Sequence, residues 1–182
     1  MNENTLASEK LPRQEYSPCS LVRGGMRFLF LDIDGVLLPY CRDESYGRVC
    51  KHIWPEGVDG FKPDCVSELN MICDTGKASI IVSSSWRWYI KDIELMRTML
   101  REQGVTAPIT GMTPFATDEW DSHDRGDEIQ AFMEPLEVEA FVIVDDADMG
   151  FRGLERYWVK TNGTSGIRRR DSVKALRILG AT

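Results

Sequence analysis

Residues 26–36 read MRFLFLDIDGV, and they are the strongest indication of the architecture. The first six of them, Met26–Leu31, form a short apolar run. Its length, and the glycines that flank the segment, are typical of a strand buried in a parallel sheet. The run leads directly into two carboxylates, Asp32 and Asp34. Gly35 supplies the bend that would turn both carboxylates toward the same edge of the sheet.

Two more apolar runs lead into polar residues. Residues 78–82 precede three consecutive serines at 83–85, and residues 140–144 precede the acidic pair Asp145 and Asp146. In an open parallel sheet, ligands bind beyond the carboxyl ends of the strands. Three strand ends are therefore predicted to meet at one site.

Segments with helical spacing lie between these strands. The periodicity predicts helices over residues 63–75, 89–103, 125–133 and 172–179, and shorter strands near residues 105–109 and 156–160. The alternation predicts an α/β fold, a three-layer sandwich around a central, mainly parallel, Rossmann-like sheet. Scattered Gly and Pro interrupt residues 36–60, so we expect a flap or minimal cap there. A polar loop is expected over residues 111–124.

The length of 182 residues suits one domain. We expect it to span residues 26–182, with residues 1–25 as a flexible N-terminal extension, because that stretch is rich in charge and poor in apolar residues. No apolar run approaches the length needed to cross a bilayer. We therefore expect a soluble, cytoplasmic protein without membrane contact, and nothing in the sequence points to an obligate protein partner.

Cysteine and histidine argue against a zinc site. The five cysteines include no Cys-x-x-Cys pair, and their odd number favours a reducing compartment over a full disulfide scheme. The two histidines, His52 and His123, do not stand at ligand spacing from paired cysteines. The acidic residues at the predicted strand ends are better candidates for a metal site.

The charge is unevenly distributed along the chain. The net charge of −7 argues against a surface built wholly for nucleic acid. Residues 150–182 carry eight basic and two acidic residues, a local charge of +6 that leaves −13 for the rest. This segment, which includes Arg168, Arg169 and Arg170, would guide an anionic substrate to the site. A solvated basic turn and terminal helix would account for it equally well.

Carboxylates without nitrogen or sulfur partners favour Mg²⁺, which takes oxygen ligands. Asp32 and Asp145 are the expected side-chain ligands. The backbone carbonyl of Asp34 and the carboxylate of Asp146 would complete the shell directly or through water. Asp148 is an alternative to Asp146 as the second acid.

The same residues suggest phosphoryl transfer. Asp32 would act as the nucleophile, and Asp34 would protonate the leaving oxygen and later activate water. A transferring phosphoryl group also needs donors on its oxygens. We expect the hydroxyl of Ser84, with Ser83 as the alternative, and the guanidinium of Arg125 at a predicted helix start.

The turn after the second strand is the expected substrate wall. We assign Gly35, Ser83, Ser85, Trp86 and Arg87 to substrate binding, with the indole for stacking and the guanidinium for a phosphate. A structural alternative stays open for the aromatic residues, which would then pack the helix start onto the sheet. The serines would then form only a turn with local bonds to the backbone.

At this point the chain resembles the haloacid dehalogenase (HAD) superfamily. Its four motifs are matched in order by Asp32-x-Asp34-Gly35-Val36, the strand-Ser element, Arg125-Gly126 and the apolar-Asp145-Asp146 element. Lysine is usual at the third motif, and this sequence carries arginine instead. The resemblance implies phosphomonoester hydrolysis through an aspartyl-phosphate intermediate.

A narrower resemblance is to the small HAD domains of Swiss Army Knife RNA repair proteins. The stretches that carry it are LFLDIDGVL, SSSWR, GMTP at residues 111–114, the helix start RGDEI at residues 125–129, and VDD at residues 144–146. This resemblance implies nucleotides or nucleic-acid ends as substrates.

Two other classes of function compete with a phosphatase. A phosphoacceptor signalling domain gathers similar groups, but it places the acidic pair first and the acceptor aspartate in mid-chain, whereas here Asp32 and Asp34 open the domain. A catalytically silent binding module would keep the fold without the chemistry. The retention of every chemical group argues against that reading.

Overall fold

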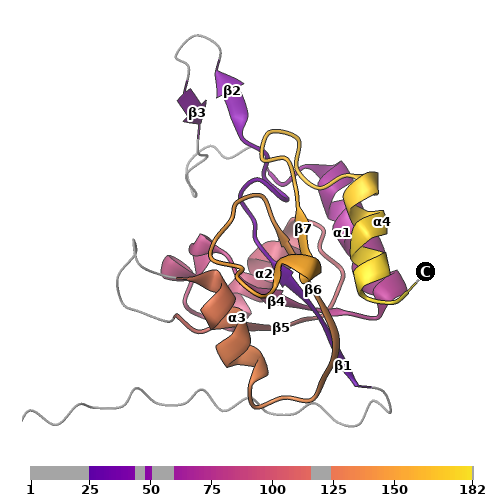
Figure 1. The fold of residues 1–182 in the computed structure, drawn as a ribbon. Helices are drawn as coiled ribbons and strands as arrows, with labels where there is room; N and C mark the ends of the chain where they lie inside the picture. Colours follow the sequence, from indigo (N-terminus) through magenta and orange to yellow (C-terminus); the bar gives the residue numbers. More distant parts are fainter. Residues whose placement is uncertain (1–24, 44–47, 51–59, 116–123, 182) are drawn as a thin grey trace, which may run out of the picture.

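A computed structural model describes residues 25–43, 48–50, 60–115 and 124–181 of the chain. Its centre is a five-stranded sheet in the order β5-β4-β1-β6-β7, in which every neighbouring pair is parallel (Figure 1). The strands are β1 (Met26–Leu31), β4 (Ser79–Val82), β5 (Ile109–Met112), β6 (Val138–Asp145) and β7 (Trp158–Lys160). The predicted α/β fold with a parallel sheet is confirmed.

Helices cover both faces of this sheet. They are α1 (Pro63–Gly76), α2 (Ile93–Glu102), α3 (Arg125–Met133) and α4 (Arg169–Ile178). Leu29 and Leu31 of β1 belong to the buried cluster that includes α1, α2 and α4, whereas Phe28 and Phe30 pack with α3. Figure 1 shows α3 on one side of the sheet and α1 with α4 on the other. The central strand is thus buried on both faces, as its continuous apolar run predicts.

One strand lies later in the sequence than predicted. We expected it near residues 105–109, but β5 covers Ile109–Met112, so the start of the predicted loop belongs to the sheet. The chain after α2 is used to close that helix: Gly104 takes a left-handed φ of 89°, and the amide of Val105 donates to the carbonyl of Leu100 at 3.0 Å. The strand therefore begins only after this turn.

Two helix starts also differ from their predictions. The helix expected from residue 89 begins at Ile93. The carboxylate of Asp92 caps it by accepting hydrogen bonds from the backbone amides of Glu94 at 2.7 Å and Leu95 at 3.0 Å. The last helix begins at Arg169 rather than at 172, since Asp171 accepts from the amide of Arg168 at 3.0 Å. Most of the predicted basic turn is therefore helical.

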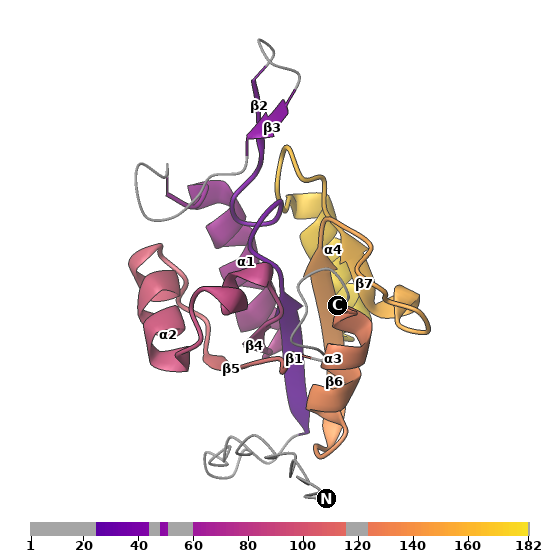
Figure 2. The ribbon, with the colours of Figure 1, turned by 90° about the vertical axis from the view of Figure 1, so that its left-hand side faces the viewer.

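A small antiparallel hairpin lies within the predicted flap. It consists of β2 (Cys41–Asp43) and β3 (Arg48–Cys50) and stands beyond the carboxyl end of β1 (Figure 2). Residues 44–47 and 51–59 of the flap, the N-terminal extension up to residue 24 and both histidines lie outside the described residues. Within the described part, no helix is both long and apolar enough to span a membrane.

Candidate active site

Every strand of the main sheet ends at a buried polar residue. These residues are Asp32 after β1, Ser83 after β4, Thr113 after β5, Asp145 at the end of β6 and Thr161 after β7, and each is at most 4% exposed. An unsatisfied polar group costs about 1–3 kcal/mol to bury. Asp32, Ser83 and Thr113 each keep a buried side-chain oxygen without a partner among the described residues, so this edge of the sheet indicates a binding site rather than part of the apolar core.

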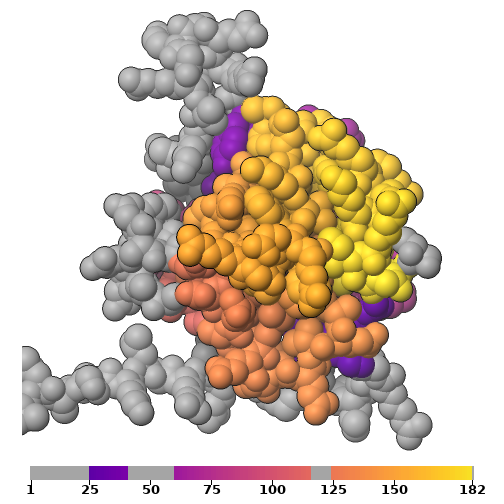
Figure 3. All heavy atoms as spheres, in the orientation of Figure 1, coloured from indigo at the N-terminus to yellow at the C-terminus, as the bar shows by residue number. Residues whose placement is uncertain are grey.

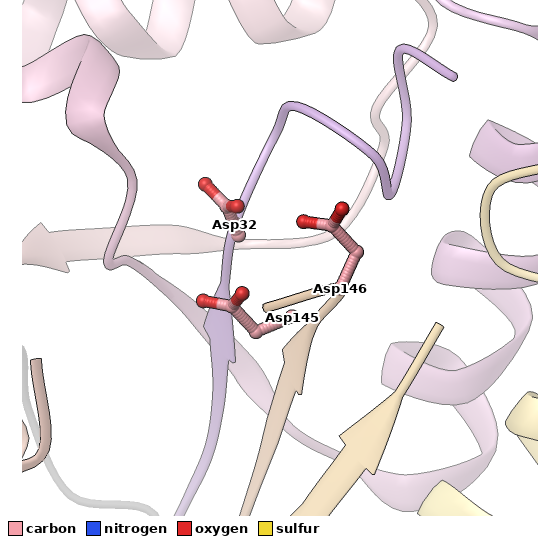
Figure 4. Close-up of side chains that lie close together, drawn as sticks. All are labelled: Asp32, Asp145 and Asp146. Atoms are coloured by element: carbon pink, nitrogen blue, oxygen red, sulfur yellow. The ribbon is translucent and has the colours of Figure 1, made fainter. Parts of the chain in front are cut away.

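Three carboxylates meet at the centre of this edge. Asp32, Asp145 and Asp146 each offer an oxygen atom within 4.8 Å of the other two (Figure 4). Burial, and next the charge of Asp32, raise the pKa of Asp145 to about 8, and the same two causes raise the pKa of Asp146. Oδ1 of Asp32 is buried and has no hydrogen-bond partner among the described residues. The mutual repulsion of these carboxylates and the unpartnered oxygen of Asp32 fit a site for a divalent cation with oxygen ligands.

Gly35 makes the close approach of these carboxylates possible. Its φ is +70°, and a Cβ atom at this position would lie 2.3 Å from the carboxylate carbon of Asp146. Thr161 holds the turn from the other side, because its hydroxyl donates to the carbonyl of Gly35 at 3.0 Å. The predicted bend after Asp34 is therefore present, and only glycine fits it.

Arg125 stands beside the acidic residues as the first residue of α3. It is 4% exposed; its Nη1 donates to Asp145 Oδ2 and lies 3.1 Å from Asp32 Oδ2. Burial by itself lowers the pKa of this guanidinium, but Asp32 and Asp145 together raise it and prevail. The helix start is fixed by the predicted N-cap, since Asp124 accepts from the amide of Asp127 at 3.2 Å.

The neighbouring serines Ser83 and Ser84 differ in their surroundings. Ser84 is fully buried, and its Oγ accepts from the amide of Trp86 at 3.4 Å as the cap of a 3-10 turn, η1 (Ser85–Trp88). The Oγ of Ser83 has no partner among the described residues. The amide of Ser83 donates to the carbonyl of Leu31 at 2.8 Å, so Ser83 lies beside the end of β1. Its free hydroxyl is therefore the better candidate for a phosphate contact.

Trp86 contacts the second carboxylate of the first motif. Its Nε1 donates to Asp34 Oδ2 at 3.1 Å, and its ring lies edge-on to Phe61 with centroids 6.1 Å apart. The side chain is only 7% exposed. The indole thus orients Asp34 from a buried position, which agrees with the structural alternative rather than with an open stacking wall.

Arg87 points into the protein. It is 1% exposed, and its donors reach the carbonyls of Ser84 at 2.8 Å and Thr113 at 2.7 Å. A third donor, Nη2, lies 2.7 Å from Glu128 Oε2, in an ion pair whose two side chains are at most 2% exposed. The direct phosphate contact expected of Arg87 is not supported by this placement, because each nitrogen of the guanidinium donates to a protein group.

A family model described as the HAD domain in Swiss Army Knife RNA repair proteins matches residues 28–172. The chain belongs to this HAD family. The resemblance inferred from the motifs is confirmed, and membership indicates a phosphatase-type function. Neither the comparison with curated proteins nor that with solved structures gave a significant match.

The HAD site brings together most of the residues expected from the sequence. The acidic residue that joins Asp32 and Asp145 is Asp146, whereas Asp148 is exposed and accepts from the amide of Gly150 at 3.2 Å. Ser85 lies in the turn η1 and is half-buried.

Four residues near the HAD site had no role in the sequence analysis. Thr113 and Thr161 follow strand ends; the misplaced end of β5 hid Thr113, whereas the end of β7 was predicted at residue 160 and Thr161 was not considered. Tyr40 lies near the carboxylates, and burial, and next the charge of Asp146, raise its pKa. Glu128 lies in the first turn of α3, where acidic residues are common because they stabilise a helix start, so its charge gave no sign of a role at the site.

Proposed function

We propose that this HAD domain is a Mg²⁺-dependent phosphomonoester hydrolase that works through an aspartyl phosphate on Asp32. The observation that carries the proposal is the environment of the Asp32 carboxylate. Its Oδ2 is paired with Arg125 at 3.1 Å, and its Oδ1 is buried without a hydrogen-bond partner in the described part of the chain. A carboxylate with one oxygen fixed and the other free suits a nucleophile.

The proposed metal ligands are the carboxylates of Asp32, Asp145 and Asp146, with the backbone carbonyl of Asp34 as a further ligand. When bound, Mg²⁺ would neutralise the carboxylates and polarise a phosphoryl oxygen. Gly35 keeps the space beside Asp146 open for this arrangement.

The proton and the phosphoryl group are handled by the protein's own side chains. Asp32 attacks phosphorus while Asp34 gives its proton to the leaving oxygen, so the leaving group departs as an alcohol. Asp34 then takes a proton from water as the water attacks the aspartyl phosphate, which releases phosphate and restores Asp32. Trp86 fixes Asp34 for both steps through its hydrogen bond at 3.1 Å.

Ser83 and Arg125 are the proposed donors to the phosphoryl oxygens. Ser83 replaces Ser84 in this role, because the hydroxyl of Ser84 caps the turn η1 whereas that of Ser83 has no partner among the described residues. Preorganised donors of this kind stabilise the charge that spreads over the oxygens in the transition state.

Nucleotides or nucleic-acid ends are the proposed substrates. The family is described by its occurrence in RNA repair proteins. Residues 150–181, which carry the excess of positive charge, gather on one face of the molecule (Figure 3). Such a face would attract a polyanion.

The proposal is tested by phosphate release from an aryl phosphate with and without Mg²⁺. We expect activity that EDTA removes and Mg²⁺ restores, no activity in Asp32→Asn, and weaker Mg²⁺ activation in Asp146→Asn. Asp148→Asn is the matched control, because this exposed aspartate lies outside the carboxylate group. Failure of the wild type to hydrolyse any member of a broad phosphomonoester panel would refute the proposed enzymatic activity.

Substrate class is tested separately. A 3′-phosphorylated oligonucleotide is compared with mononucleotides, sugar phosphates and phosphopeptides. Equal or better turnover of sugar phosphates would exclude the nucleic-acid proposal. An acyl phosphate that persists for minutes would favour the signalling alternative over the phosphatase.

A further inference from the structure

The buried ion pair between Arg87 and Glu128 lies outside the proposed chemistry. We propose that it is a positioning pair, which sets the phosphate-binding hydroxyl of Ser83 and the guanidinium of Arg125 at their working separation. The inference rests on the proposed function, because it concerns the geometry of that same site.

The pair joins three segments that build the site. Nε of Arg87 donates to the carbonyl of Ser84 in the turn after β4, at 2.8 Å. Nη1 donates to the carbonyls of Thr113 at 2.7 Å and Pro114 at 3.2 Å, after β5. Nη2 reaches Glu128 of α3 at 2.7 Å. One rigid, planar group therefore spans two strand ends and a helix start.

Two of the joined segments carry a group that we propose contacts the phosphate. Ser84 directly follows Ser83, whose free hydroxyl is the proposed phosphate donor. Glu128 lies three residues after Arg125 on α3, and positions three apart lie on the same side of a helix. A shift of Arg87 would therefore move the hydroxyl and the guanidinium relative to each other.

The burial of the pair argues that geometry is its purpose. Removing two charges from water is costly, and a buried ion pair is often no more stabilising than apolar residues of similar volume. Arg87 is nevertheless the largest fully buried side chain among the described residues. The ring of Phe115 covers its guanidinium at 4.6 Å, and Trp88 stacks on that ring at 4.0 Å.

The structure also offers a matched control. Arg97 donates from Nε to the carbonyl of Ile109 at 2.8 Å and pairs with Glu94. Arg97 therefore links a glutamate to the amino end of β5, away from the site, whereas Arg87 links a glutamate to the segment after the carboxyl end of β5.

The test compares Arg87→Lys, Glu128→Gln, the apolar double variant Arg87→Met/Glu128→Leu, and the control Arg97→Met. For each, kcat and KM with an aryl phosphate at saturating Mg²⁺ are measured beside Tm. Misplacing catalytic groups by about 1 Å can cost about 100-fold in rate. We therefore expect kcat to fall by about 10- to 100-fold in all three pair variants, with a smaller change in KM and wild-type kcat in Arg97→Met.

The apolar double variant separates positioning from stability. Under the proposal its Tm is close to that of the wild type while its kcat stays low. Wild-type kcat in any folded pair variant would overturn the inference, and so would loss of folding in both conservative variants, which would show a purely structural role. An inactive wild type would instead refute the proposed function, so the two failures are distinct.

Discussion

Ser83 and Ser84 are adjacent and chemically identical, yet only Ser83 keeps a hydroxyl without a partner in the described part of the chain. Removal of one oxyanion donor typically costs about 100- to 1,000-fold in kcat. We expect Ser83→Ala to show a loss of this order at unchanged Tm. Ser84→Ala should mainly lower Tm, because it removes the cap of η1. The opposite pattern in steady-state kinetics would return the phosphate contact to Ser84.

Gly35 tests the metal side of the site. Gly35→Ala would strain a left-handed backbone and push a Cβ atom to within 2.3 Å of the Asp146 carboxylate carbon. We expect its Kd for Mg²⁺, measured by calorimetry, to rise by at least about tenfold, as loss of a residue that orients a ligand does. Gly153→Ala is the control, since Gly153 has φ +79° but nothing within 4 Å of its would-be Cβ. Equal Mg²⁺ affinity in both variants would refute the role of this contact.

Single residues of the site were predictable where they follow a recognisable strand. Asp32 and Asp145 each stand at the end of an apolar run, and the structure places them together with Asp146. Arg87 was assigned to a phosphate and lies buried in the protein, because sequence shows a charge but not the direction of its side chain. Glu128 had no signal, since its partner lies 41 residues away in the chain.

At the level of elements, the start of α3 sets the position of Arg125. Asp124 caps this helix, and loss of a cap costs about 1 kcal/mol, or roughly 2–4 °C in Tm for a protein of this size. We expect Asp124→Ala to lower both Tm and kcat. Asp92→Ala removes the equivalent cap of α2, away from the site, and should lower Tm alone. Equal kcat in the two variants, measured in parallel with thermal unfolding, would contradict the role of α3.

Element types were more predictable than their bounds. The strand before Thr113 was placed about four residues too early, because the apolar residues from Val105 onward look alike whether they close a helix or form a strand. The structure uses Val105 to close α2 and begins β5 at Ile109. That shift hid Thr113 as a strand end, and with it one of the five polar residues along the edge.

At the scale of the whole molecule, the packing of the helices on the sheet makes the free energy of unfolding depend on pH. Cys73 of α1 is 3% exposed, and burial raises the pKa of its thiol from 9.0 to about 12. The folded protein therefore favours the protonated thiol, so this stabilisation is complete below pH 9 and is lost as pH rises toward 12. We expect the free energy of unfolding to fall by up to about 1.4 kcal/mol per pH unit above 9.

Urea unfolding at pH 8, 9 and 10 checks this prediction. The variant Cys73→Val serves as the reference, because it retains an apolar side chain and lacks the thiol. The difference in free energy of unfolding between the two proteins should be constant below pH 9. Above pH 9 the wild type should lose stability relative to the variant. A difference that does not depend on pH would show that Cys73 is not isolated from solvent.

The central claim is that Asp32 carries the phosphoryl group, and trapping that intermediate tests it most directly. Wild-type protein turning over an aryl phosphate with Mg²⁺ is quenched with borohydride, which reduces an acyl phosphate, and the peptide containing residues 26–36 is analysed by mass spectrometry. We predict that Asp32 is reduced to homoserine, and only when substrate and Mg²⁺ are both present. Active wild-type protein with an unmodified Asp32, or with the modification on Asp34 instead, would contradict the account.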